Sequence, residues 1–264
     1  MLLCHCCSLD TASGTTFAFA PLASTALMQL LDLTLPGPEM NLALDEALLT
    51  AAEEGTGGEV LRLWEQPTYT VVVGSGGSVV IDVNLSACAA AGVPVLRRAS
   101  GGGTVLLGPG CLCFSLVLSY DRAPGLNEIP ASNRYILARV ISALKPVAIA
   151  SVEGTSDLAV NGVKFSGNAQ QRKRKYFLHH GTLLCGFDLA LVSQYLNPPE
   201  RQPEYRRDRP HGDFITNLPV RPEEVKQLLV NEWCPEGDYA PVPLIRAHAL
   251  VAEKYSRAEW NRRR

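Results

Sequence analysis

Apolar and polar residues follow two periods along the chain, one typical of helices and one typical of strands. The helical spacing occurs in five segments: residues 39–54, 83–92, 131–144, 222–233 and 244–255. Apolar runs bounded by glycine or proline predict strands over residues 59–64, 69–74, 93–98 and 111–119, with three more short runs within residues 156–187. Because no regular strand–helix–strand repeat appears, we expect an α+β domain with a mixed, largely antiparallel sheet flanked by helices.

The length and hydropathy of the chain suit one large domain that starts near Met28. Its 264 residues, 47% of them hydrophobic, are enough to bury a full core. We expect residues 1–27 to be a flexible extension or a misassigned start. No lysine or arginine precedes Arg62, so the front lacks the basic residues of a targeting signal. The sequence contains no run of about 18 apolar residues, so we expect no membrane span.

Charge is uneven along a nearly neutral chain. Eight acidic residues precede Arg62, so the 24 basic residues that follow face only 18 acidic ones. This modest excess suits a nucleotide phosphate or an acidic protein partner, and it falls short of the density typical of nucleic-acid binding. We therefore expect neither a nucleic acid nor a membrane as a partner.

The eight cysteines are scattered through apolar or helical patterns, which favours reduced thiols in a cytoplasmic protein. The "CHCC" stretch over residues 4–7 contains metal-ligand types, but no second ligand pair follows it at a zinc-like spacing. We predict no metal site.

The stretch "RRASGGGTVLLGPGC", residues 97–111, has three consecutive glycines between two predicted strands. Glycines allow backbone N–H groups to approach a bound anion closely, so a phosphate or carboxylate is the expected guest. The stretch matches neither a P-loop nor the dinucleotide-binding glycine pattern. Side chains alternate along a strand, so only one of Arg97 and Arg98 should face the ligand. The alternative is an ordinary glycine-rich hairpin.

A hairpin is predicted in "TSDLAVNGVKFSGNAQ", residues 155–170, because Asn161-Gly162 suits a two-residue type I′ turn. The expected pairs are Val160–Val163, Ala159–Lys164, Leu158–Phe165 and Asp157–Ser166. Asp157 and Lys164 then share a face on which the carboxylate could position the ammonium or a metal ion. The alternative is a surface hairpin with a solvated lysine.

Two adjacent histidines follow in "FLHHGTLL", residues 177–184. His179 and His180 point to opposite sides of an extended strand, so they cannot easily ligate one metal. A packed or hydrogen-bonded pair is the simpler expectation.

In this order and at these separations, the three stretches resemble the lipoate-protein ligase family, which shares a superfamily with biotin-protein ligases and octanoyltransferases. Further matches are "MNLALDEAL", "YLNP", "TNL" and "EKYSRAEWN", and the resemblance covers Met28 to about Asn261. It implies the fold of the catalytic core of class II aminoacyl-tRNA synthetases and biotin-protein ligases, here as one catalytic domain over residues 28–264 without a C-terminal accessory domain.

The resemblance also implies a reaction. Lipoate, or octanoate, and Mg-ATP would give the acyl-adenylate, and the acyl group would pass to a lysine of a lipoyl carrier domain, in a 2-oxoacid dehydrogenase E2 subunit or the glycine cleavage H protein. Lys164 would be catalytic and contact both acyl carbonyl and phosphate, and the acyl chain would lie in an apolar tunnel near residues 71–73. The other implied substrate- and nucleotide-binding residues are Arg98, Ser100, Gly101, Gly102, Gly103, Thr104, Val105, Leu106, Asp157, Gly167 and His180.

Two departures from the family pattern leave alternatives open. Many family ligases continue the glycine motif with an aromatic residue and His-Asp, where this chain has "LLGPGC", and larger ligases continue beyond "AEWN" into an accessory domain. A separate accessory subunit is one explanation. The alternatives are an ATP-independent octanoyl or lipoyl transferase that uses a cysteine thioester, for which Cys111 and Cys113 are candidates, and a non-catalytic homologue that binds lipoyl-AMP or a carrier.

Overall fold

The computed structural model describes residues 27–200 and 202–263. The expected extension, apart from its last residue, and the "CHCC" stretch lie outside the described residues. In the part that is described, no helix has both the length and the apolar character needed to cross a membrane.

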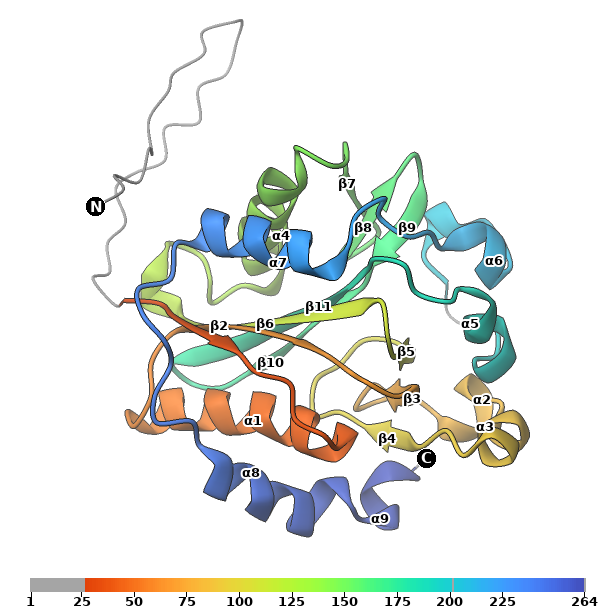
Figure 1. The fold of residues 1–264 in the computed structure, drawn as a ribbon, viewed down its shortest axis with the longest axis horizontal. Coiled ribbons are helices and arrows are strands. Elements are labelled where there is room, and N and C mark those ends of the chain that lie inside the picture. Colours follow the sequence, from red (N-terminus) through yellow and green to blue (C-terminus); the bar gives the residue numbers. More distant parts are fainter. Residues whose placement is uncertain (1–26, 201, 264) are drawn as a thin grey trace, which may run out of the picture.

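A five-stranded sheet in the order β1-β2-β6-β11-β10 forms the centre of the molecule (Figure 1). Its strands are β1 (Gln29–Asp32), β2 (Val60–Glu65), β6 (Cys111–Ser119), β10 (Asn168–Arg172) and β11 (Tyr176–Leu184). The pair β1 and β2 is parallel and all other neighbours are antiparallel. The expected α+β class with a mixed, largely antiparallel sheet is confirmed.

Helices cover both faces of this sheet, so its middle strands are buried on both sides. Helix α1 (Pro38–Glu54) lies on one face with α8 (Leu244–Leu250) outside it, while α4 (Ile129–Leu144) and α7 (Pro222–Trp233) lie on the other (Figure 1). Every residue of β6 is buried as a result. The predicted helices for α1, α4 and α7 are confirmed to within two residues. The predicted helix over residues 244–255 changes to a π-helical turn at Val251–Tyr255, and α9 (Ala258–Asn261) follows.

Two small three-stranded sheets flank the central one. The first joins β3 (Thr70–Val73) to β4 (Val95–Arg97) in parallel and to β5 (Val105–Leu107) antiparallel. The second contains β7 (Ser151–Glu153), β8 (Asp157–Val160) and β9 (Val163–Ser166). Short helices complete the chain: α2 (Val79–Asp82), α3 (Leu85–Ala91), α5 (Ala190–Tyr195) and α6 (His211–Phe214), with 3-10 turns at Tyr120–Arg122 and Glu204–Arg206.

The hairpin of β8 and β9 agrees with the predicted register only near its turn. Both turn residues have positive φ, and the pairs Val160–Val163 and Ala159–Lys164 are present. The predicted pairs Leu158–Phe165 and Asp157–Ser166 are wrong, because a bulge after Leu158 places Leu158 opposite Ser166. Leu158 and Phe165 are both fully buried, and the bulge lets both enter the core from adjacent strands.

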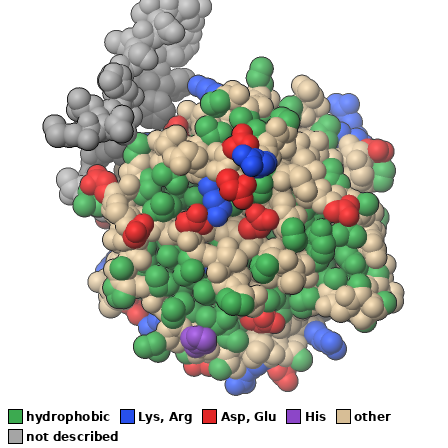
Figure 2. Space-filling view, in the orientation of Figure 1, with side chains coloured by type: hydrophobic (Ala, Val, Ile, Leu, Met, Phe, Trp, Pro, Cys, Tyr) green, Lys and Arg blue, Asp and Glu red, His purple; other side chains and the backbone are tan. Residues whose placement is uncertain are grey.

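On the face seen in Figure 2, acidic and basic side chains are interspersed among apolar ones, and no single basic patch is present.

Candidate functional site

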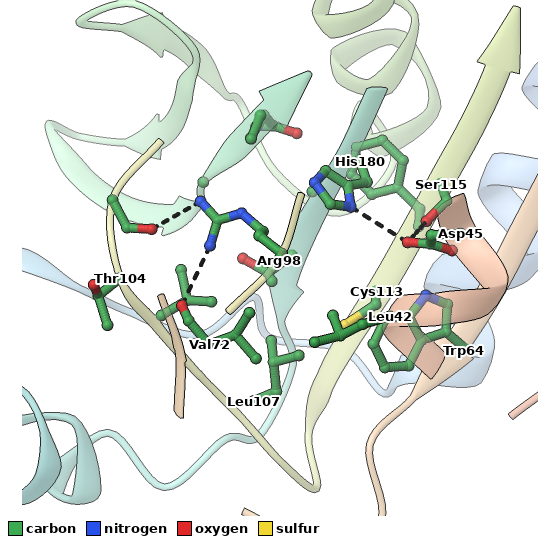
Figure 3. A pocket seen from close by; sticks show the side chains of 18 of the residues that line it. Leu42, Asp45, Trp64, Val72, Arg98, Thr104, Leu107, Cys113, Ser115 and His180 are labelled. Carbon is green, nitrogen blue, oxygen red and sulfur yellow. Dashed lines mark hydrogen bonds and ion pairs between the residues drawn. The ribbon is translucent and has the colours of Figure 1, made fainter. Parts of the chain in front are cut away.

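An inner cavity of about 130 Å³ opens between the central sheet, the small β3–β5 sheet and the β8–β9 hairpin. Its apolar walls come from α1, β2, β3, β5 and β6: Leu42, Trp64, Val72, Leu107 and Cys113, which Figure 3 labels, and Phe114. Of the three valines expected beside an acyl tunnel, Val72 lines the cavity, and Val71 and Val73 do not.

A larger groove of about 900 Å³ continues from this cavity. Both spaces are lined by Gly103, Thr104, Val105, Asp157, Lys164, Gly167 and Thr182, so Lys164 stands where the smaller cavity meets the larger groove. The far walls of the groove are the Gly76–Ser78 turn and the segment that carries Arg206 and His211. The Thr104 hydroxyl donates a hydrogen bond of 2.8 Å to Asp82, which ties the end of the glycine loop to α2.

The triple glycine forms the loop between β4 and β5, and Arg98 holds it from within. The Arg98 guanidinium donates to the carbonyls of Gly101 (2.6 Å), Gly103 (2.8 Å) and Val72 (3.2 Å). Burial lowers the pKa of Arg98 to about 10, so it remains a cation at neutral pH. Its donors therefore shape the loop, and its expected contact with a ligand stays a prediction.

The three glycines differ in why they are glycines. Gly102 has φ of +84°, and a Cβ there would lie 2.9 Å from an Arg98 nitrogen. Gly101 and Gly103 have ordinary backbone angles, and a Cβ at either would meet no protein atom within 4 Å. Only Gly103 of these two lines the cavity. The protein itself therefore has no steric need for glycine at residue 103, which suggests that the need comes from what binds beside it.

Lys164 is held by a carboxylate whose other oxygen is also engaged. Its Nζ lies 2.8 Å from Asp157 Oδ1, and the Tyr205 hydroxyl donates to Asp157 Oδ2 at 2.7 Å. Burial and the Asp157 charge raise the pKa of Tyr205, which keeps the phenol protonated as a donor. A Cβ at Gly167 would come within 3.0 Å of Nζ, so this glycine makes room for the ion pair.

A buried polar chain leads from α1 to the glycine loop. His180 Nδ1 lies 3.3 Å from Asp45 Oδ2 (Figure 3). Its Nε2 lies 2.6 Å from Ser100 Oγ, which accepts from Arg98 Nε at 3.0 Å. Burial opposes ionisation of Asp45, but the Arg62 guanidinium 2.6 Å away and hydrogen bonds from His180 and Ser115 hold its pKa below the ordinary value. The ionised Asp45 selects the His180 tautomer that carries its proton on Nδ1.

His179 points the opposite way, as expected for its strand. It is fully buried and stacks on Phe114, and burial lowers its pKa to about 3, with the neighbouring His180 as a smaller cause. Its Nε2 lies 3.3 Å from the side-chain oxygen of Asn168, a residue of the cavity wall. A Cβ at Gly181 would overlap this Asn168 oxygen at 2.0 Å, which explains the glycine after the two histidines.

The structure brings most of the predicted site residues together. Those in the inner cavity are Arg98, Gly103, Thr104, Val105, Asp157, Lys164, Gly167 and His180. Gly102 and Leu106 line only the outer groove, while Ser100 and Gly101 line neither space and act through Arg98 and His180. A binding role for each of these residues stays a prediction.

Sequence reasoning missed Asp45, Arg62, Asn168 and Tyr205. A signal was present for Arg62, which is the one charged residue among the apolar residues of "VLRLW", residues 60–64. Nothing local marked Tyr205. Within residues 27–200 and 202–263, no group of three or more histidine, cysteine or acidic side chains is placed to hold a metal ion.

Cys88, Cys111, Cys113 and Cys185 are buried free thiols. Cys113 lines the cavity, and burial, followed by the neighbouring Cys111 and Asp45, raises its pKa well above the ordinary value. Burial likewise raises the pKa of Cys185 to about 12.

Comparison with known proteins gives a consistent assignment. The sequence model of the lipoyl protein ligase A/B catalytic domain matches residues 37–233. A protein from Mycoplasma pneumoniae named probable lipoate-protein ligase A is 36% identical over 161 residues, 61% of this chain and 46% of its own length. The chain therefore spans about half the length of relatives of this kind.

Two further relatives match over most of their length. The octanoyltransferase LipM of Brevibacillus brevis is 25% identical over 86% of this chain and 95% of its own. The solved structure of a bi-partite lipoate protein ligase from Thermoplasma acidophilum superposes with a TM-score of 0.76 at 25% identity, covering 90% of this chain and 96% of the other.

Proposed function

The chain belongs to the family of the lipoyl protein ligase A/B catalytic domain, and on that premise we propose that it activates lipoate with ATP and transfers the lipoyl group to a lysine of a lipoyl carrier domain. The observation that carries this proposal is the position of Lys164. It stands, held by Asp157, at the junction of a small cavity with a mainly apolar lining and a larger groove whose lining is polar and apolar in similar parts. An acyl-adenylate has the same division, with an apolar chain on one side of a mixed anhydride and a nucleotide on the other.

The first step needs positive charge at that junction. A carboxylate oxygen of lipoate attacks the α-phosphorus of ATP. A new O–P bond forms, the bond from the α-phosphorus to the bridging oxygen breaks, and pyrophosphate leaves. Two anionic groups approach each other in this step, so a fixed ammonium and preorganised backbone donors lower its barrier. Lys164 supplies the ammonium, and Mg²⁺ enters with ATP, bound largely by the phosphates of this substrate.

In the second step the neutral amine of the carrier lysine attacks the acyl carbonyl, AMP leaves, and the amine loses a proton. Lys164 faces the same atoms and stabilises the oxygen that becomes negative. Asp157 and Tyr205 keep the ammonium in place through both steps. The open groove is the route by which the carrier lysine arrives.

Three points extend this proposal. A carrier in a 2-oxoacid dehydrogenase E2 subunit or the glycine cleavage H protein is the acceptor, and the Thermoplasma ligase was solved as part of a lipoylation system with its E2 lipoyl domain. That ligase is bi-partite, which supports a separate accessory subunit here as well. The buried free thiols of Cys88, Cys111, Cys113 and Cys185 suit a reducing compartment such as the cytoplasm.

Transfer of an octanoyl group through a cysteine thioester is the second candidate, favoured by the likeness to LipM over 95% of its length and by Cys113 in the cavity wall. The nucleophile in that chemistry is a thiolate. Burial disfavours the thiolate of Cys113, and this weighs towards the ATP-dependent route. A homologue that only binds lipoyl-AMP or a carrier would need neither reaction.

The test is intact-mass analysis of a purified carrier domain after incubation with the protein in three mixtures. These contain lipoate with Mg-ATP, presynthesised lipoyl-AMP, or an octanoylated carrier as donor. Modification in the first establishes the full ligation, modification only in the second indicates transfer without activation, and modification only in the third establishes the thioester route. Absence of modification in all three leaves the binding role.

Lys164→Ala should lower the rate of lipoyl transfer by a factor of about 10² to 10³, the usual effect of removing one transition-state donor. The matched control is Lys226→Ala, because Lys226 is also ion-paired, at 2.6 Å to Asp32, and lies outside both spaces. Both variants should keep the thermal transition of the parent. Substantial activity in Lys164→Ala would remove this lysine from the mechanism.

A further inference from the structure

The motif "EKYSRAEWN", residues 253–261, resembles the family but has no task in the chemistry above. Its end, α9, lies against β4 and is bonded to one residue of that strand, Arg97. The Arg97 N–H donates to the Asn261 side chain at 2.9 Å, and the Arg97 carbonyl accepts from Trp260 Nε1 at 2.8 Å. Residues 258–263, here called the tail, therefore complete the hydrogen bonding of β4 at Arg97.

The fully buried Arg97 side chain connects this tail to a second glycine loop. Its guanidinium donates to the carbonyls of Gly74 and Gly77, both at 2.8 Å, and to the carbonyls of Trp260 (3.2 Å) and Asn261 (3.4 Å). Arg263 adds a direct bond of 3.1 Å from the tail to the Ser75 carbonyl.

The loop held in this way, residues 74–77, forms both a wall of the groove and the support of the triple glycine. Gly76 and Gly77 line the groove. The Ser75 N–H donates to the Ser100 carbonyl at 2.8 Å, and a Cβ at Gly74 would lie 2.0 Å from the Gly102 carbonyl oxygen. The two glycine loops thus pack backbone against backbone, with the tail as the layer behind them.

We propose that Trp260, Asn261 and Arg263 act, through Arg97 and the 74–77 loop, as positioning residues for the nucleotide end of the groove, so that docking of the tail and binding of ATP favour each other. This rests on the proposed function for the identity of the nucleotide. A loop held in its bound shape loses less conformational entropy when the ligand binds. Thermodynamic linkage makes this coupling reciprocal. Bound ATP must stabilise the docked tail by the same free energy by which the docked tail stabilises bound ATP.

The variant that tests this is Trp260→Ala. It removes the indole N–H that donates to the Arg97 carbonyl. It also removes the ring whose centroid lies 4.2 Å from Lys254 Nζ and 3.7 Å from Arg263 Cζ. Calorimetric titration with Mg-ATP should show a rise in Kd of about fivefold or more, the equivalent of one lost hydrogen bond. The Kd for lipoate should stay unchanged, because no residue of the 74–77 loop lines the inner cavity. Arg262→Ala, an exposed neighbour, is the matched control.

Trypsin gives the reciprocal measurement, since Arg257 and Arg262 are exposed on either side of α9. Mg-ATP should slow cleavage at both arginines in the parent protein. In Arg262→Ala it should slow cleavage at Arg257 to the same extent. In Trp260→Ala the protection by Mg-ATP should be much smaller. Trp260→Phe, which keeps a ring but loses the N–H donor, covers the case in which Trp260→Ala fails to fold. Equal ATP affinity in all folded variants, or a rise in Kd for lipoate as large as that for ATP, would overturn the proposal. A parent protein that binds no ATP contradicts the proposed function instead.

Discussion

Replacing Gly103 by alanine separates a glycine that the fold needs from one that a ligand needs. The added methyl group meets no protein atom within 4 Å, and the backbone there has no positive φ. Gly101→Ala is a control from the same loop, because its added methyl group also meets no protein atom within 4 Å and Gly101 lines neither the cavity nor the groove. Gly102 cannot serve, because its positive φ and its contact with Arg98 would strain any other residue.

The structure sets the size of the expected effects. Gly→Ala at a compatible backbone position stabilises a protein by about 0.4–1 kcal/mol through the unfolded chain, so neither variant should lower the melting temperature. If the acyl-adenylate packs against the backbone at Gly103, the methyl group overpacks that contact at a cost of about 1–3 kcal/mol. This corresponds to a loss of roughly 5- to 150-fold in affinity for lipoyl-AMP.

The assay is calorimetric titration of both variants and the parent with lipoyl-AMP, next to thermal unfolding of each. The expected result is weaker binding of lipoyl-AMP by Gly103→Ala and unchanged binding by Gly101→Ala, with both variants at least as stable as the parent. Parental affinity in Gly103→Ala would show that the triple glycine is only a turn. Equal losses in both variants would contradict the division between the two residues.

Two further predictions concern the cysteine and histidine next to the site. Cys113→Ser should retain most of the ATP-dependent lipoylation, measured by intact mass, because ligation needs no thiolate; complete loss with a folded protein would show that the ligation itself depends on this thiol. His179 has its pKa lowered from 6.5 to about 3 by burial, so the unfolded chain binds more protons between these values. Its contribution to stability is therefore complete above about pH 6.5 and decreases as the pH falls toward 3, by up to about 1.4 kcal/mol per pH unit. Urea unfolding from pH 7 to 4 should show a smaller loss for His179→Gln than for the parent, and equal slopes would mean that His179 titrates normally.

The hydrophobic pattern predicted the central elements well because their signals are local. Strand β6 and helix α7 begin and end where the apolar runs do, at Cys111–Ser119 and Pro222–Trp233. The edge strands β1 and β7 and the short helices α2, α5 and α6 were not predicted. Each has only three to six residues, and tertiary contacts rather than an internal period stabilise such segments.

The bulge in the β8–β9 hairpin shows the same limit at the site. Turn chemistry at Asn161-Gly162 determined the first two pairs, since positive φ is a property of these two residues. Farther from the turn, the burial of Leu158 and Phe165 determined the register instead.

The sequence by itself determined the loop of three glycines, the hairpin that presents Lys164 beside Asp157, and the opposite directions of the two histidines. These follow from backbone angles and side-chain alternation over a few residues. Only the tertiary structure decided that Asp45 meets His180 across 135 residues, that Tyr205 completes the carboxylate behind Lys164, and that the C-terminal tail is bonded through Arg97 to a glycine loop. The physical reason is that these partners meet through the order of strands in the sheets and the packing of helices upon them, and no local period of the chain contains that order.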